Sequence, residues 1–151
     1  MAQTVHDPAR TGRPGGPAGP GRLLVVVYAV LALAATGRSA LQLATRFEQA
    51  PLAYLLSALA AAVYIVATVA LAGRGPRARA VAWAAVLFEL FGVLAVGALS
   101  ALEPELFPRD TVWSGFGRGY LLVPLVLPLA GIAWLESSLR GRLRDAAEAE
   151  R

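Results

Sequence analysis

Glu89 has the greatest potential for chemistry in this chain, because it interrupts a long run of apolar residues. It follows Arg79 by ten positions, which places it about 15 Å along a helix and near the middle of a bilayer. An ionised carboxylate at that depth costs at least about 2.5 kcal/mol, so we expect Glu89 to be protonated or paired and to face other helices. Two roles fit: a proton or cation relay, and a neutral acid that hydrogen-bonds a neighbouring helix. The second is favoured because interhelical polar pairs commonly hold membrane helices together.

Tyr64 and Arg38 are the candidate partners of Glu89. Tyr64 precedes Arg74 by ten positions, so it should lie at a depth similar to that of Glu89 on an antiparallel neighbour. Arg38 follows Arg22 by sixteen positions, about 24 Å along its helix, and would have to bend inward to reach the carboxylate. We therefore predict Tyr64 as the hydrogen-bond partner and keep Arg38 as the second choice.

The remaining residue types offer little for catalysis. There is no Cys, which excludes disulfides and thiol chemistry, and the single His6 lies in a Pro/Gly-rich stretch. Gly115, Gly117 and Gly119 do not match the G-x-G-x-x-G spacing of a nucleotide site. Ser114 has no neighbouring His or Lys to act as a base. The sequence therefore predicts no enzymatic activity, no cofactor and no metal site.

Long apolar runs must position the intramembrane residues. The chain is 57% hydrophobic and 16% charged, whereas a soluble domain has about 25% charged residues. Its apolar runs predict transmembrane helices at about residues 23–46, 51–72, 80–102 and 119–136. The predicted fold class is all-α: a membrane-spanning four-helix bundle over residues 23–136. Pro124 and Pro128 should kink the fourth helix.

Both ends of the chain are polar. Residues 1–22 are rich in Pro and Gly and predict a disordered cytoplasmic tail. Residues 137–151 predict a charged cytoplasmic tail, whose leucines at every fourth position could lie on the membrane surface. Residues 23–37 also fit a cleaved signal peptide, because Arg22 precedes a 15-residue apolar stretch. The helical pattern continues past Arg38, which favours a retained helix.

The arginines predict the orientation of the chain in the membrane. All 14 basic residues are Arg. With a cytoplasmic N-terminus, ten lie inside and four outside, as the positive-inside rule requires. The inner ones are Arg10, Arg13, Arg22, Arg74, Arg77, Arg79, Arg140, Arg142, Arg144 and Arg151, and the outer ones are Arg38, Arg46, Arg109 and Arg118. This pattern predicts a multi-pass protein of the cell membrane with both termini cytoplasmic, and it does not suggest nucleic-acid binding.

Aromatic residues should mark the two interfaces of the membrane. Trp83 and Trp134 fall near the inner interface, and the predicted outer belt comprises Phe47, Tyr54, Trp113 and Tyr120. Such belts are expected where an amphipathic ring meets the lipid headgroups.

Four short segments resemble a known group of proteins. They are TGRS at 36–39, LQLATRF at 41–47, LFELF at 87–91 and DTVWSGFGRGY at 110–120. Across residues 23–136 the chain resembles small uncharacterised four-helix integral membrane proteins of GC-rich actinobacteria. The resemblance implies the fold and no reaction. Small multidrug transporters also have four helices and one embedded Glu, but theirs is in the first helix, so that match is rejected.

Two functions are compatible with these features. The first is a non-enzymatic structural or accessory subunit, whose partners are the lipid bilayer and other membrane proteins or a second copy of itself. The alternative is a small proton-coupled transporter or channel that uses Glu89.

Overall fold

The computed structural model describes residues 19–150, and every regular element in that range is helical. The α-helices are α1 (Pro20–Thr45), α2 (Pro51–Ala72), α3 (Pro76–Leu102) and α4 (Val123–Ala149). Three 3₁₀ helices lie between them: η1 (Phe47–Gln49), η2 (Pro104–Leu106) and η3 (Ser114–Tyr120). Most of the predicted tail, residues 1–18, lies outside the described residues, as does residue 151. The last residues of that tail form the first turn of α1, where Pro20 costs nothing because first-turn N–H groups have no helical partner.

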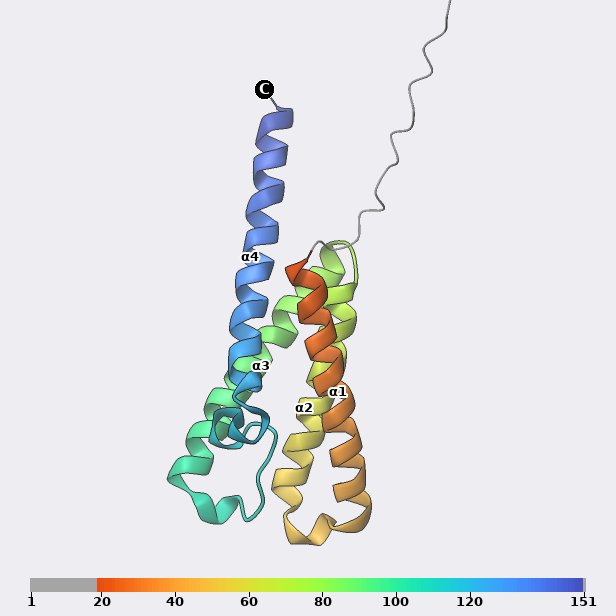
Figure 1. The fold of residues 1–151 in the computed structure, drawn as a ribbon. Helices are drawn as coiled ribbons and strands as arrows, with labels where there is room; N and C mark the ends of the chain where they lie inside the picture. Colours follow the sequence, from red (N-terminus) through yellow and green to blue (C-terminus); the bar gives the residue numbers. More distant parts are fainter. Residues whose placement is uncertain (1–18, 151) are drawn as a thin grey trace, which may run out of the picture.

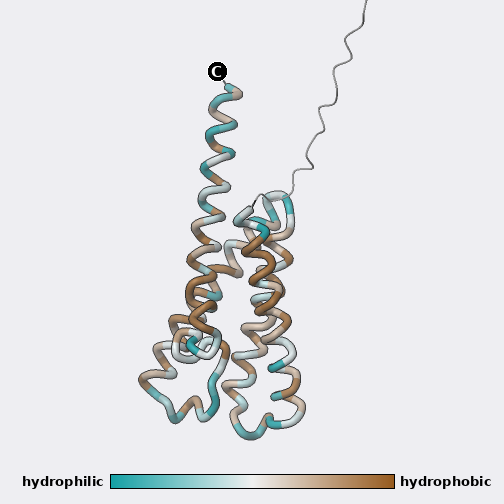
Figure 2. Tube along the Cα trace, in the orientation of Figure 1, coloured by the Kyte–Doolittle hydropathy of each residue, from teal (hydrophilic) through white to brown (hydrophobic). Residues whose placement is uncertain are grey.

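The four α-helices form an elongated bundle (Figure 1). α1 lies alongside α2, α3 crosses from α2 towards α4, and the second half of α4 projects past the other helices. The start of α1, the turn between α2 and α3, and the end of α4 lie at one end of the molecule. Hydrophobic residues occupy the middle of the bundle, and hydrophilic ones concentrate at its ends and along the projecting part of α4 (Figure 2).

Three helices, α1, α2 and α3, are long and apolar enough to cross a membrane. η3 and α4 reach that standard only as a pair, and the pair is bent by 98°. Large apolar side chains such as Leu33 and Phe91 face outward, 78% and 69% exposed, as expected of surfaces that contact lipid tails. The all-α prediction is confirmed for the described residues, and the chain has the features of a helical membrane protein with three or four spans.

The fourth span differs from its prediction. A single helix was expected over residues 119–136 with kinks at Pro124 and Pro128, but the break precedes both prolines. Leu121 and Leu122 have φ of 56° and 61°, in the left-handed region, and α4 begins at Val123. Pro124 therefore sits in the first turn, where its missing N–H costs nothing, and only Pro128 is internal.

The end of α4 and the predicted outer aromatic belt also differ from expectation. α4 continues through Ala149 as helix, well past residue 136. Trp113 and Tyr54 are each only 1% exposed, so neither ring presents a surface to lipid headgroups. The loop that carries Trp113 turns back into the bundle, which hides from lipid a side chain that its sequence position had placed at the interface.

Candidate intramembrane polar site

Glu89 lies in the interior of the bundle, as predicted, and is 0% exposed. It comes from the middle of α3. The hydroxyl of Tyr28, on α1, donates a hydrogen bond of 2.6 Å to its Oε2. Tyr28 is also 0% exposed. This bond joins two helices that are far apart in sequence, since 61 positions separate the two residues.

A second polar pair lies beside the first. The indole Nε1–H of Trp113 donates a 3.2 Å hydrogen bond to the hydroxyl of Tyr64, on α2. The rings of Tyr64 and Tyr28 are tilted by 58° with their centroids 6.2 Å apart. On α4, a Cβ added to Gly131 would lie 3.7 Å from the Tyr28 hydroxyl oxygen, so the glycine lets that helix come close. Side chains or backbone from all four α-helices and the loop before η3 therefore meet here.

The predicted partner of Glu89 was wrong. Tyr64 was chosen because it should lie at the same depth as Glu89, but its hydroxyl bonds Trp113, and Tyr28 bonds the carboxylate. Equal depth is a poor guide when the side chain is long. Tyr28 is eight positions from the start of α1 and Glu89 thirteen from the start of α3, an offset of about 7.5 Å along straight helices. The phenol and the helix tilt bridge this offset.

Arg38, the second predicted partner of Glu89, instead makes hydrogen bonds at the outer end of the bundle. Its Nη1 donates to the Tyr120 hydroxyl at 3.2 Å and its Nη2 donates to the backbone oxygen of Asp110 at 2.7 Å. Its guanidinium carbon also lies 5.9 Å from the centroid of the Tyr120 ring. Arg38 therefore fastens α1 to the segment between α3 and α4, and it makes no hydrogen bond to Glu89.

Short-range hydrogen bonds hold the loop that delivers Trp113. Thr111 Oγ1 accepts from the backbone N–H groups of Trp113 and Ser114, while the Thr111 N–H donates to Ser114 Oγ. Ser100 Oγ, on α3, accepts from the N–H of Gly115. Irregular backbone at membrane depth is tolerated only where protein or water satisfies its polar groups. The hydroxyls of Thr111, Ser114 and Ser100 satisfy several of these backbone groups. Ser114 therefore has a structural role in a turn.

Two glycines of α3 create the space into which this segment packs. A Cβ on Gly92 would come within 2.7 Å of the Trp113 ring, and one on Gly97 within 2.6 Å of the Phe116 ring. Both distances are too short for any real Cβ. The aromatic rings therefore lie directly on the α3 backbone, and the loop reaches deep into the bundle.

Sequence reasoning missed Tyr28 and Trp113. The signal for Tyr28 was present: Leu24, Leu31 and Ala35 fall on the same helical face and are buried with it. A tyrosine on the buried face of a span needs a partner for its hydroxyl. Trp113 gave no such signal, because its burial depends on the path of the loop.

The site has one polar atom that could still bind something. Glu89 Oε1 is buried and has no hydrogen-bond partner among the described residues. The carboxyl group could carry its proton on that oxygen. If it is ionised, the same oxygen could accept a hydrogen bond from a neighbouring donor. Among residues 19–150, no group of three or more His, Cys, Asp or Glu side chains comes together to hold a metal ion.

Comparisons with protein-family models, with curated proteins and with solved structures give no match to this chain. The resemblance to actinobacterial membrane proteins therefore stays a prediction.

Proposed function

We propose that this chain is a non-enzymatic integral membrane protein that serves as an accessory subunit of a larger membrane assembly. In this proposal the fourth span consists of η3 and α4 together. Both termini are cytoplasmic in the cell membrane. The proposed group of relatives is the small four-helix membrane proteins of GC-rich actinobacteria.

The projecting half of α4 carries this proposal. Every residue from 139 to 150 is exposed, and the helix continues in the direction of the bundle instead of turning across it (Figure 1). An isolated helix of about 12–15 residues is only marginally stable in water. Leu139 and Leu143, four positions apart and 43% and 62% exposed, form the apolar stripe that a second protein would cover.

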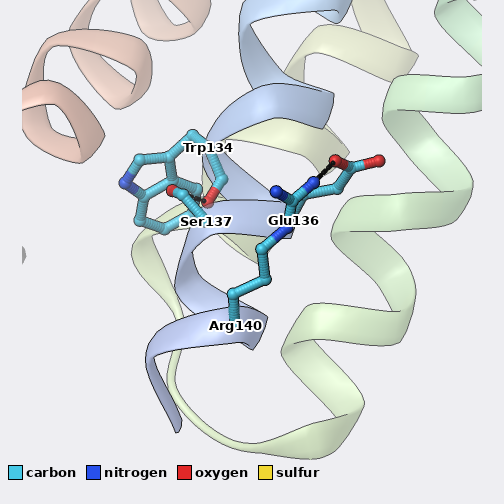
Figure 3. A network of polar contacts seen from close by, with 4 residues as sticks. All are labelled: Trp134, Glu136, Ser137 and Arg140. Atoms are coloured by element: carbon cyan, nitrogen blue, oxygen red, sulfur yellow. Dashed lines mark hydrogen bonds and ion pairs between the residues drawn. The ribbon is translucent and has the colours of Figure 1, made fainter. Parts of the chain in front are cut away.

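Local interactions supply little of the stability that this helix needs. Arg140 Nη2 lies 2.9 Å from Glu136 Oε2, and the Ser137 hydroxyl donates to the Trp134 oxygen at 2.8 Å (Figure 3). The ion pair is exposed, and such a pair one helical turn apart contributes about 0.3–0.5 kcal/mol. Burial of the leucine stripe against a partner would contribute more, since covering a whole leucine is worth about 1.5–3 kcal/mol.

Purification in mild detergent tests this role. We expect the full chain to co-purify with a partner protein at fixed stoichiometry. The double variant Leu139→Glu/Leu143→Glu should lose the partner and remain inserted. The matched control Arg144→Gln/Glu148→Gln changes exposed residues of the same helix outside the stripe and should keep it. A chain that purifies alone, or a partner retained equally by both variants, would contradict the proposal.

The arrangement of the described arginines supports the proposed orientation. Seven of them lie at the start of α1, at the turn between α2 and α3 or in the second half of α4: Arg22, Arg74, Arg77, Arg79, Arg140, Arg142 and Arg144. Four lie near the end of α1 or between α3 and α4: Arg38, Arg46, Arg109 and Arg118. The excess is on the side proposed as cytoplasmic, as the positive-inside rule expects. Reporter fusions at Gly75 and Pro108 test this orientation: the first should be active only as a cytoplasmic reporter, and the second only as an extracytoplasmic one. The opposite pattern would reverse the topology.

A small proton-coupled transporter or channel is the second candidate, favoured by the unpartnered Glu89 Oε1 beside a broken span. Transporters often build midplane sites from discontinuous helices. Reconstitution into liposomes with a trapped pH dye tests it. Proton flux that Glu89→Gln abolishes and Glu48→Gln leaves unchanged would favour this candidate. Equal flux in both variants, or none above empty liposomes, would exclude it.

A further inference from the structure

A second cleft, at the opposite end of the bundle from the projecting part of α4, has the character of an anion site. It encloses about 350 Å³. The outer turns of α1, the start of α2 and the loop at residues 107–110 form its walls. Its lining residues are Arg38, Gln42, Arg46, Tyr54, Phe107, Pro108, Arg109 and Asp110.

The charge of this cleft is unusual for its side of the membrane. Three arginines and one acidic residue, Asp110, line it, which leaves an excess of two positive charges. In the proposed orientation the outer side holds only four arginines, and three of them line this one cleft. Insertion does not require arginines on that side, where the positive-inside rule disfavours them. The clustering of three arginines in this cleft therefore needs another explanation.

The guanidinium groups are available to a ligand. Among the described residues, the guanidinium groups of Arg46 and Arg109 make no hydrogen bond or ion pair, and both residues are exposed. Arg38 is half-buried and held by Tyr120 and the Asp110 carbonyl. Those two bonds use two of its five N–H donors, so the rest of its fork remains free in a fixed orientation. A preorganised donor loses less entropy when it binds.

One residue in the wall of the cleft, Gln42, has an unsatisfied polar atom. The side-chain oxygen of Gln42 is buried and has no hydrogen-bond partner among the described residues. The lining is predominantly polar, which suits a small hydrophilic molecule and gives a lipid tail no surface to cover.

From these observations we propose that the outer cleft binds a small soluble oxyanion of charge about −2, of the phosphate type. Arginine forks bind phosphate oxygens in pairs, and the two excess positive charges balance a dianion. A monohydrogen phosphate group carries the negative oxygens that the arginines would bind. This binding site goes beyond the accessory role and does not depend on it.

Titration of inorganic phosphate by calorimetry tests the proposal, with the full chain in nanodiscs of phosphatidylcholine at low salt. We expect saturable binding that Arg46→Gln and Arg109→Gln each weaken about tenfold. Arg118→Gln removes the fourth outer arginine, which does not line this cleft, and should change binding less than about twofold. Asp110→Asn should strengthen binding, because it removes the opposing carboxylate.

Three results would overturn the proposal. One is the absence of phosphate binding up to about 10 mM, a range that covers even weak sites. Another is an equal loss in Arg46→Gln, Arg109→Gln and Arg118→Gln, which would indicate nonspecific charge attraction. The third is loss of phosphate binding when phosphatidylglycerol is added to the nanodiscs, which would make a lipid headgroup the occupant. Displacement of phosphate by sulfate, with no displacement by chloride, would support an oxyanion site.

Discussion

The α1–α2 half of the molecule and the α3–α4 half are built in different ways. α1 and α2 are uninterrupted helices of 26 and 22 residues, joined across residues 46–50. α3 and α4 are separated by residues 103–122, which turn back into the bundle with Trp113 at their deepest point. The first half follows mainly from its long apolar runs. The second half depends on individual contacts, such as those of the Trp113 and Phe116 rings with the glycines of α3.

Backbone strain marks the second half. Phe116, Leu121 and Leu122 all adopt positive φ, and they are the only non-glycine residues in the described chain that do so. Each such residue costs about 1–2 kcal/mol. The surrounding packing must offset that cost, and the rings of Trp113 and Phe116 on the α3 glycines are the contacts available for it.

Removal of Trp113 should have the largest effect on this half. Trp113 is the largest fully buried side chain and also bonds Tyr64. Trp113→Ala should lower the free energy of unfolding by about 3–5 kcal/mol. Denaturation in bicelles measures it. Phe91→Ala, at a lipid-facing position that is 69% exposed, is the control and should cost much less. Equal losses would mean that the loop adds nothing to the fold.

The same contrast explains what the sequence could predict. Residues 51–72 were predicted as a helix and match α2, because a run without charges permits only one structure in a membrane. The path of residues 103–122 could not be predicted in this way. It depends on the absence of a Cβ at Gly92 and Gly97. In the sequence these glycines do not stand out, because the helix contains many other small residues.

Alanine at two helical glycines compares the halves directly. Gly97→Ala places a Cβ 2.6 Å from the Phe116 ring, so the ring must move, at a cost of about 1–3 kcal/mol. Gly37→Ala, on α1, meets nothing within 4 Å and should stabilise the helix by about 0.5–1 kcal/mol. The two changes are chemically identical, so denaturation curves for both variants isolate the effect of the contact between the Phe116 ring and the α3 backbone at Gly97. Equal changes of the same sign in the free energy of unfolding would show that the Phe116 ring does not pack on Gly97.

The candidate site was predictable in part. Glu89 was placed correctly in the interior, because burial of a mid-span carboxylate follows from its cost in lipid. Its partner was not, since the hydroxyl of Tyr28 reaches Glu89 from a different depth. The choice between two tyrosines depends on helix tilt, which the sequence does not specify.

The smallest expected effect decides between those tyrosines. In a double-mutant cycle, Tyr28→Phe and Glu89→Leu should couple by about 0.6–1.7 kcal/mol, the range for interhelical hydrogen bonds in membranes, because each change removes one partner of the bond. Tyr64→Phe with Glu89→Leu should couple by less than about 0.5 kcal/mol, because the Tyr64 hydroxyl bonds Trp113 and not the carboxylate. Both tyrosine changes remove one oxygen from a fully buried ring, so each controls for the other. If the Tyr64 cycle gave the larger coupling, the two halves of the molecule would be joined through α2 and α3 instead of α1 and α3. Both cycles near zero would mean that Glu89 makes no significant interhelical bond, and the free energy that keeps its carboxyl group inside the bundle would have to come from packing alone.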